Sequence, residues 1–206
     1  MSEKKTEMVT NRRSLLKLAA VTGISMAVQT SAIASQKTET DCPKANGGTL
    51  PHRVLGKGEA AFEVSALGLG VMGMTYNRSQ HPDKKACIRL LHDAVEHGVT
   101  LFDTAIIYGP LNNEELAGEA LSSLRNRINV TTKFGHEVID GKATGRQDSR
   151  PATIRRYCEE SLKRLRLEAI PLFYQHRFDK NTPVEDVAST LADLIKEGKV
   201  LHWGMC

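Results

Sequence analysis

The 206-residue sequence lacks the features that mark several classes of protein. No apolar stretch approaches the roughly 20 residues that a membrane-spanning helix needs, so no transmembrane anchor is expected. Four cysteines and seven histidines show no metal-ligand spacing such as H-x-H or H-E-x-x-H. The net charge is only +4, and residues 1–34 hold most of it, with five basic side chains against two acidic ones. The rest of the chain therefore does not support nucleic-acid binding.

The first 34 residues have the pattern of an export signal. A charged start leads to "NRRSLLK", in which Arg12 and Arg13 are adjacent, and then to a mildly apolar stretch. Ala32 and Ala34 form an A-x-A site, which predicts cleavage after Ala34. The segment resembles a twin-arginine (Tat) signal and predicts a periplasmic protein that is recognised by the Tat export machinery. The alternative is a chance arginine pair in a cytoplasmic protein.

Regular patterning begins after a polar segment, residues 35–51, which we interpret as a linker. The domain is expected over residues 52–206, starting with a hairpin. Strands and helices then alternate. Strands are predicted at 65–70, 99–103, 128–133, 169–176 and 200–205, and helices at 83–98, 113–121, 152–165 and 182–198.

This alternation predicts parallel βαβ units. Two architectures fit it, a doubly wound open sheet and a (β/α)₈ barrel. The match of Gly68, Gly70 and Gly73 to G-x-G-x-x-G does not support a Rossmann domain, because the following helix starts about ten residues too late. We interpret these glycines as the exit from the first strand.

Two local predictions concern the helices. Cys87 and Cys158 fall on apolar helical faces, so both are expected in the core. Thr182, Pro183 and Glu185 have the spacing of an N-cap, a first-turn proline and a capping-box acid. The last helix should therefore start at this point, and its buried stripe should run from Val184 to Ile195.

Ionisable residues end three consecutive predicted strands. They are Asp103 in "LFD", Lys133 in "TTK" and His176 in "YQH", and Tyr108 follows Asp103 closely. Taken singly, an aspartate at a strand end is commonly a cap or turn residue, a lysine is usually solvated, and a histidine is more often structural than catalytic. Sites in barrel enzymes are built at the carboxyl ends of several strands, so the set together predicts an active site.

The four residue types suit carbonyl reduction. Tyrosine has an unperturbed pKa near 10, and a neighbouring ammonium should lower the pKa of the phenol by stabilising the phenolate. A carboxylate can hold the lysine, and a histidine can hydrogen-bond a carbonyl oxygen. No side chain supplies hydride, so a cofactor must do so, and no metal is expected.

Five motifs, in order, resemble those of the aldo-keto reductase family. They are "RVLGKGEAAFEVSALGLGVMGM", "FDTAIIYGPLNNEELAGEAL", "VTTKFG", "SLKRLRLEAIPLFYQHRFD" and "LIKEGKVLHWGMC". The resemblance implies a (β/α)₈ TIM barrel that reduces small aldehydes or ketones with NADPH. It further implies that Tyr108 is the proton donor, that Asp103 and Lys133 tune it, and that His176 orients the substrate. Gly70, Val71, Met72 and Asp103 would lie near the nicotinamide.

The sequence departs from the family pattern in two ways. Pro171 stands where an aspartate is usual, and the motifs stop after the fifth strand. A complete barrel typically needs about 250 residues. We therefore expect an incomplete barrel of about five β/α units plus the hairpin, truncated before the segments that hold much of the cofactor. The alternative function is a non-catalytic remnant or interaction module with an open sheet edge. The sequence does not identify the carbonyl substrate or the oligomeric state.

Overall fold

The computed structural model describes residues 50–77 and 79–206. The predicted signal segment, and all but the end of the predicted linker, lie outside these residues. No helix in the described part of the chain is both long and apolar enough to cross a membrane.

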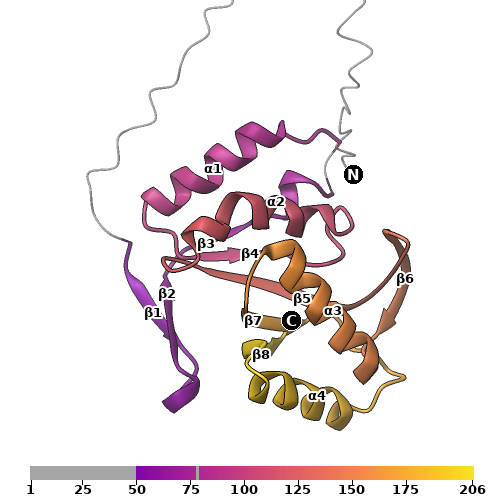
Figure 1. The fold of residues 1–206 in the computed structure, drawn as a ribbon. Helices are drawn as coiled ribbons and strands as arrows, with labels where there is room; N and C mark the ends of the chain where they lie inside the picture. Colours follow the sequence, from indigo (N-terminus) through magenta and orange to yellow (C-terminus); the bar gives the residue numbers. More distant parts are fainter. Residues whose placement is uncertain (1–49, 78) are drawn as a thin grey trace, which may run out of the picture. The chain divides into compact units, whose positions relative to one another are not determined.

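A curved, mainly parallel sheet forms the centre of the fold (Figure 1). Its strand order is β3-β4-β5-β7-β8, and all four neighbouring pairs are parallel. The five strands are β3 (Gly68–Gly70), β4 (Leu101–Asp103), β5 (Asn129–Ile139), β7 (Ile170–Gln175) and β8 (Val200–Met205). The predicted βαβ alternation is confirmed, and the strands described do not close into a barrel.

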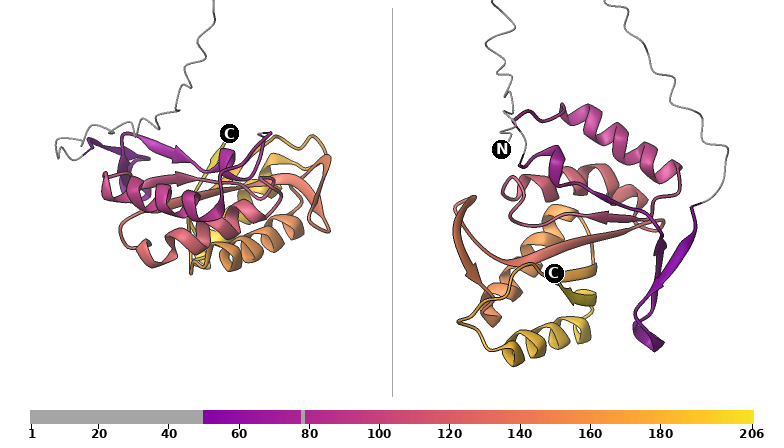
Figure 2. Two further views of the ribbon diagram at one scale, coloured as in Figure 1. Left: turned by 90° about the horizontal axis from the view of Figure 1, so that it is seen from above. Right: turned by 180° about the vertical axis from the view of Figure 1, so that it is seen from behind.

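Four helices link successive strands and gather on one face of the sheet (Figure 2). They are α1 (Lys84–Glu96), α2 (Asn112–Leu121), α3 (Pro151–Leu165) and α4 (Val184–Lys196). One apolar cluster packs α1 and α2 on β4, and a second packs α3 and α4 on β7. Cys87 belongs to the first cluster and Cys158 to the second, so both are core residues as predicted.

The predicted amino-terminal hairpin is also present. Strands β1 (His52–Leu55) and β2 (Phe62–Ser65) pair antiparallel. The backbone N–H of Ser65 donates to Thr100 Oγ1 at 2.7 Å, just before β4, and Asn129 Nδ2 at the start of β5 donates to the Glu63 carbonyl at 3.3 Å. These contacts place the hairpin at the amino-terminal ends of the strands, opposite the ends where Asp103 and Lys133 lie.

A second hairpin was not predicted. Strand β5 runs past Lys133 to Ile139, and β6 (Lys142–Asp148) returns antiparallel to it. Asp140 and Gly141, at the turn, both have positive φ, 48° and 70°. An Asp-Gly pair between two strands favours such a two-residue turn, so the sequence did contain the signal. β6 is almost wholly exposed, and it therefore lacks the apolar alternation by which strands are usually recognised.

Helix α4 differs from the prediction in where it starts and in which of its residues are buried. Thr182 does not cap the helix, because its hydroxyl donates to Asp179 Oδ2 at 2.8 Å and α4 begins at Val184 without a side-chain cap. The buried stripe consists of Val187, Thr190, Leu191 and Leu194. Val184 and Ile195, expected in that stripe, are 43% and 37% exposed. They therefore lie at the margins of the buried face of α4.

Candidate active site

Strand register brings the predicted site residues to one edge of the sheet. Gly70 pairs with Asp103, and Asp103 with Thr131 of β5. Side chains alternate along a strand, so Lys133, two residues beyond Thr131, lies on the same inner face. The Thr131 hydroxyl donates to Asp103 Oδ1 at 2.6 Å, which fixes the carboxylate. The aligned strand ends thus account for the meeting of residues that are far apart in the sequence.

The loop after β4 carries Tyr108 to this edge. Thr104 and Ile106 donate backbone hydrogen bonds to the carbonyls of Thr131 and Lys133, at 2.9 and 3.4 Å, so the loop continues alongside β5. Gly109 then turns the chain with a φ of 85°, and a Cβ at that position would lie 1.7 Å from Asn112 Oδ1. A side chain at residue 109 would therefore be strained by the backbone conformation and would require the Asn112 side chain to move.

Lys133 is the common partner of the other residues. Its side chain is 6% exposed. Nζ donates to Asp103 Oδ2 at 2.5 Å, to the Thr104 carbonyl at 2.7 Å and to the Tyr108 hydroxyl at 3.5 Å. An ammonium has three donors, so Lys133 uses all of them here. The structure thus brings Asp103, Lys133 and Tyr108 together in one contact group.

The protonation of Tyr108 differs from the expectation. Burial, followed by the charge of Asp103, raises the pKa of Tyr108 to about 12 instead of lowering it. Lys133 binds Asp103 and the Thr104 carbonyl more closely than the phenol, so its charge is largely balanced by Asp103. At neutral pH the phenol therefore keeps its proton.

His176 completes the group from β7. Its backbone N–H donates to the Phe134 carbonyl at 2.8 Å, and its ring meets the Tyr108 ring edge-on with centroids 5.7 Å apart. Burial, followed by the charge of Lys133, lowers the pKa of His176 to about 4, so the imidazole is neutral near pH 7. His176 Nδ1 is buried and has no hydrogen-bond partner among the described residues.

A pocket of about 380 Å³ opens beside Tyr108 and His176. Its lining comes from four segments: the loop after β3, the loop after β4, the β5–β6 hairpin, and the chain that follows β7. The lining residues are Met72, Tyr76, Asn77, Ile107, Tyr108, His136, Ala143, Gly145, His176 and Arg177. The volume lies within the range of small-molecule sites. The unpredicted hairpin therefore forms one side of the pocket.

The four predicted cofactor contacts differ in accessibility. Gly70 is exposed, and a Cβ there would meet no atom within 4 Å, so space is open above it and beside Asp103. Met72 lines the pocket. Val71 is fully buried, its N–H donates to the Asp103 carbonyl, and its carbonyl accepts from Asn113 Nδ2. Val71 therefore holds the loop in place and presents no free polar group.

Sequence reasoning missed the buried polar residues that support the site. Asn113 accepts from the Thr104 hydroxyl at 2.5 Å and donates to Val71 and Thr75, so one amide ties the loops after β3 and β4. Nothing in the sequence distinguishes this asparagine from the exposed Asn112 beside it, except that Asn113 lies on the buried face of α2.

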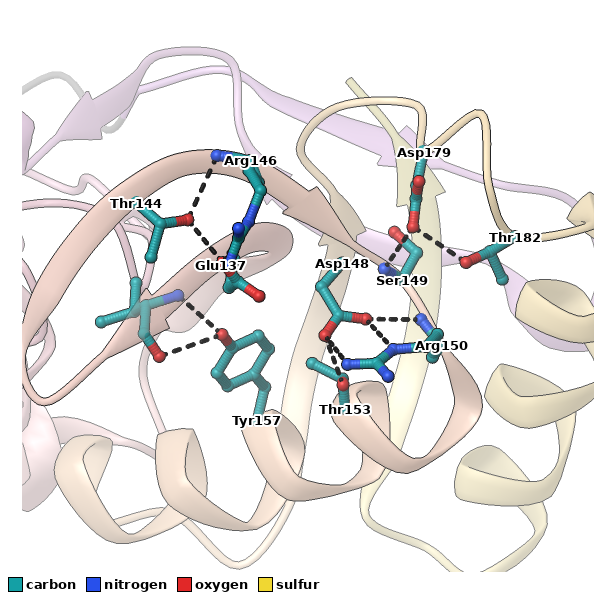
Figure 3. Close-up of polar contacts among 11 residues, drawn as sticks. Glu137, Thr144, Arg146, Asp148, Ser149, Arg150, Thr153, Tyr157, Asp179 and Thr182 are labelled. Carbon is teal, nitrogen blue, oxygen red and sulfur yellow. Dashed lines mark hydrogen bonds and ion pairs between the residues drawn. The ribbon is translucent and has the colours of Figure 1, made fainter.

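A second supporting group centres on Asp179, three residues after His176, and Figure 3 shows its contacts with Ser149 and Thr182. Asp179 Oδ2 accepts from the Ser149 N–H at 2.9 Å and from the Thr182 hydroxyl, and Gln175 Nε2 donates to Ser149 Oγ at 3.1 Å. These bonds join the end of the β5–β6 hairpin to the segment that carries His176. Among the described residues, no three His, Cys, Asp or Glu side chains gather in a way that could hold a metal ion.

The aldo/keto reductase family model matches residues 66–206. The chain belongs to the aldo/keto reductase family. A probable aldo-keto reductase from Glycine max is 40% identical over 149 residues, which cover 72% of this chain and 43% of the relative. The chain therefore spans less than half the length of that curated relative.

Solved aldo-keto reductase structures share the fold. A holo-form aldo-keto reductase from Bacillus halodurans matches with a TM-score of 0.67 and 28% identity, over 76% of this chain and 50% of that chain. The glycerol dehydrogenase from Gluconobacter oxydans matches with a TM-score of 0.63 and 34% identity, over 78% and 48%. The described sheet is thus an incomplete TIM-type barrel with about five β/α units, as the sequence predicted.

Proposed function

We propose that the chain carries the proton-donating part of an NADPH-dependent oxidoreductase that reduces aldehydes or ketones to alcohols. Membership of the aldo/keto reductase family supports an oxidoreductase of this kind. The observation that carries the proposal is that Lys133 Nζ contacts both Asp103 and the Tyr108 hydroxyl at the edge of a small pocket.

Each residue has a defined part in this proposal. A reduced nicotinamide supplies hydride to the carbonyl carbon when it is bound. The Tyr108 hydroxyl, protonated at neutral pH, donates its proton to the carbonyl oxygen as negative charge develops there. Lys133 stabilises the phenolate that remains, and Asp103 holds Lys133. Neutral His176 lies beside Tyr108 and can donate a hydrogen bond to the same oxygen.

The residues present can border the nicotinamide end of the cofactor. The open space at Gly70, next to the partly exposed carboxylate of Asp103, can accept a flat ring close to the backbone. We propose that Gly70, Met72 and Asp103 contact the nicotinamide, and that Val71 positions their loop. The preference for NADPH is part of the same proposal.

A conservative substitution at Tyr108 tests the function. Tyr108→Phe removes the proton donor and keeps the ring, so reduction of a small aldehyde should fall by a factor of about 10² or more. NADPH oxidation measures turnover, and NADPH fluorescence on titration measures binding separately. Tyr76→Phe, in the stacked neighbouring ring, is the matched control and should retain turnover. Equal rates for Tyr108→Phe and the unmodified protein would exclude Tyr108 as the donor.

An exposed sheet edge favours a second candidate function, a module that pairs with another chain. Leu201, Trp203 and Met205 of β8 are 51%, 37% and 57% exposed. Leu201 and Trp203 line a groove of about 720 Å³ between β8 and the amino-terminal hairpin. Light scattering after size-exclusion chromatography tests this hypothesis. A protein that is monomeric at all concentrations and also oxidises NADPH would exclude it.

We also propose export by the Tat machinery, with periplasmic location and no stable membrane anchor. The support is the arginine pair and the A-x-A site, which lie outside the described residues. Cell fractionation of an Arg12→Lys, Arg13→Lys double variant should find the protein retained in the cytoplasm. An unchanged distribution would favour the cytoplasmic alternative.

A further inference from the structure

The pocket beside Tyr108 has an uneven distribution of charge. None of its ten lining residues is acidic, and Arg177 is the lining residue with a permanent positive charge. Two carboxylates in the segments that form the pocket already have partners. Asp103 binds Lys133, and Asp179 accepts from Ser149, Asn181 and Thr182. An anionic group could therefore enter this pocket without meeting an acidic side chain.

Arg177 is available for such a group. It is exposed, it directly follows His176, and Nη1 donates to the His176 carbonyl at 2.8 Å. A guanidinium has five N–H donors in a planar fork, and no ion pair of Arg177 is found among the described residues. Its charge contributes to lowering the pKa of His136 and the pKa of His176, which agrees with a guanidinium close to both rings.

The β5–β6 hairpin, which carries His136, is hydrogen-bonded to α3 at two points (Figure 3). The Tyr157 hydroxyl of α3 accepts from the Val138 N–H at 2.9 Å, which attaches β5 to the helix layer. Asp148, at the end of β6, accepts from Arg150 and from the Thr153 hydroxyl. Because the hairpin is anchored at both points, the side of the pocket that His136 lines is held in place.

An unpaired buried atom also points to a ligand in this pocket. His176 is only 7% exposed and lines the pocket, yet its Nδ1 has no partner in the described part of the chain. Buried polar atoms are nearly always hydrogen-bonded. A ligand, or water held with it, would complete the environment of this ring, whose edge meets the His136 ring with centroids 4.9 Å apart.

We propose that Arg177 and His136 form a carboxylate-binding subsite, so that the preferred substrate is a small aldehyde or ketone carrying a carboxylate. This inference rests on the proposed function. The carbonyl oxygen would lie at Tyr108, and the carboxylate at Arg177 on the rim of the same 380 Å³ pocket. NADPH, when bound, would supply hydride to the carbonyl carbon, and Tyr108 would donate its proton to the oxygen. The product is the hydroxy acid, with its carboxylate unchanged.

Ligand binding tests the subsite without requiring turnover. Glutarate should shift and saturate the imidazole NMR signals of His136 and His176 in ¹⁵N-histidine-labelled protein, and the neutral analogue glutaramide should not. Arg177→Gln should weaken glutarate binding about tenfold to a hundredfold, because it removes a charge-assisted pair, and Arg177→Lys should weaken it less. Arg89→Gln, on the exposed face of α1, is the matched control and should bind normally. Equal glutarate affinity in Arg177→Gln and the unmodified protein would overturn the proposal.

Turnover separates this inference from the function on which it rests. In the full chain with NADPH, 4-oxobutanoate should have a higher kcat/KM than butanal, and Arg177→Gln should remove that preference mainly through KM. Turnover of both substrates with a ratio unaffected by Arg177→Gln would overturn the subsite. Glutarate binding that depends on Arg177, without NADPH oxidation of either aldehyde, would overturn the proposed function and support the subsite.

Discussion

Two ion pairs lie on opposite faces of β5, at the adjacent residues Lys133 and Thr132. On the inner face, Lys133 is 6% exposed and its partner Asp103 is 38% exposed. On the helix face, Thr132 donates to Glu114 Oε1 at 2.6 Å, and Arg164 donates to Glu114 Oε2 at 2.7 Å. Glu114 is fully buried there, and Arg164 is 12% exposed. The inner pair is open to the pocket edge, whereas the outer pair is closed between α2, α3 and the sheet.

This difference distinguishes the inner pair, which belongs to the candidate active site, from the outer pair, which is a structural contact. Glu114 has both oxygens occupied by fixed partners, and Gly118 of α2 packs so closely on α3 that a Cβ would lie 2.1 Å from the Arg164 carbonyl. Glu114 therefore has no free oxygen that could take part in a reaction. The inner pair instead leaves Asp103 partly hydrated and directs the third donor of Lys133 to Tyr108. Similar residue types thus serve different purposes because of what surrounds them.

The largest expected loss of stability comes from breaking the outer pair, Glu114 and Arg164. Glu114→Gln leaves the largely buried Arg164 charge with only the more distant Glu160 carboxylate, 3.7 Å from Arg164 Nη1, so the free energy of unfolding should fall by about 3 kcal/mol. Urea unfolding followed by circular dichroism measures the change. The neighbouring Glu115 is exposed, and Glu115→Gln should stay within about 0.5 kcal/mol. Equal losses of unfolding free energy for the two variants would mean that the outer pair does not stabilise the fold.

An intermediate effect is expected for Asp148, whose carboxylate is buried against an exposed Arg150. The hydrogen bonds from Arg150, above all, lower the pKa of Asp148 from 3.8 to about 2. Asp148→Asn should therefore cost about 2 kcal/mol at neutral pH. Because the folded pKa is depressed, this contribution is present above pH 3.8 and is lost as the pH falls toward 2.

Unfolding at several pH values checks this prediction for Asp148. Asp93→Asn, on the exposed face of α1, serves as the control and should change little. A difference between Asp148→Asn and the unmodified protein that persists undiminished at pH 2 would contradict the role of the ionised carboxylate.

The smallest effect on stability is expected from breaking the inner pair, Asp103 and Lys133. The effect on activity should be large. Lys133→Met leaves Asp103 hydrated, so the free energy of unfolding should fall by only about 1 kcal/mol. The same variant removes the cation beside Tyr108 and should abolish carbonyl reduction. Comparing its unfolding curve and NADPH oxidation with those of Glu114→Gln tests the contrast. A loss of stability as large as that of Glu114→Gln would mean that the inner pair is also structural.

The sequence predicted the inner pair but not the outer one. Asp103 and Lys133 end apolar strands, and strand register alone brings such positions together. Glu114 and Arg164 lie on helices rich in charged residues, so nothing local marks them as buried. The raised pKa of Tyr108 was also missed, because burial and the balance of charges around Lys133 depend on packing. The contact of Thr182 with Asp179 was missed for the same reason, whereas β6 was missed because it is exposed and lacks apolar alternation.

The turn at Asp140 and Gly141 has a consequence for how substrate preference could change. The hairpin it closes supplies His136, Ala143 and Gly145 to the pocket, while its tip is exposed and makes no contact with the inner ion pair. Insertions or substitutions near the tip would therefore reshape one side of the pocket and leave Asp103, Lys133 and Tyr108 in place. Substrate range and proton transfer are thus encoded in separable modules, which can diverge independently during evolution or be exchanged by engineering.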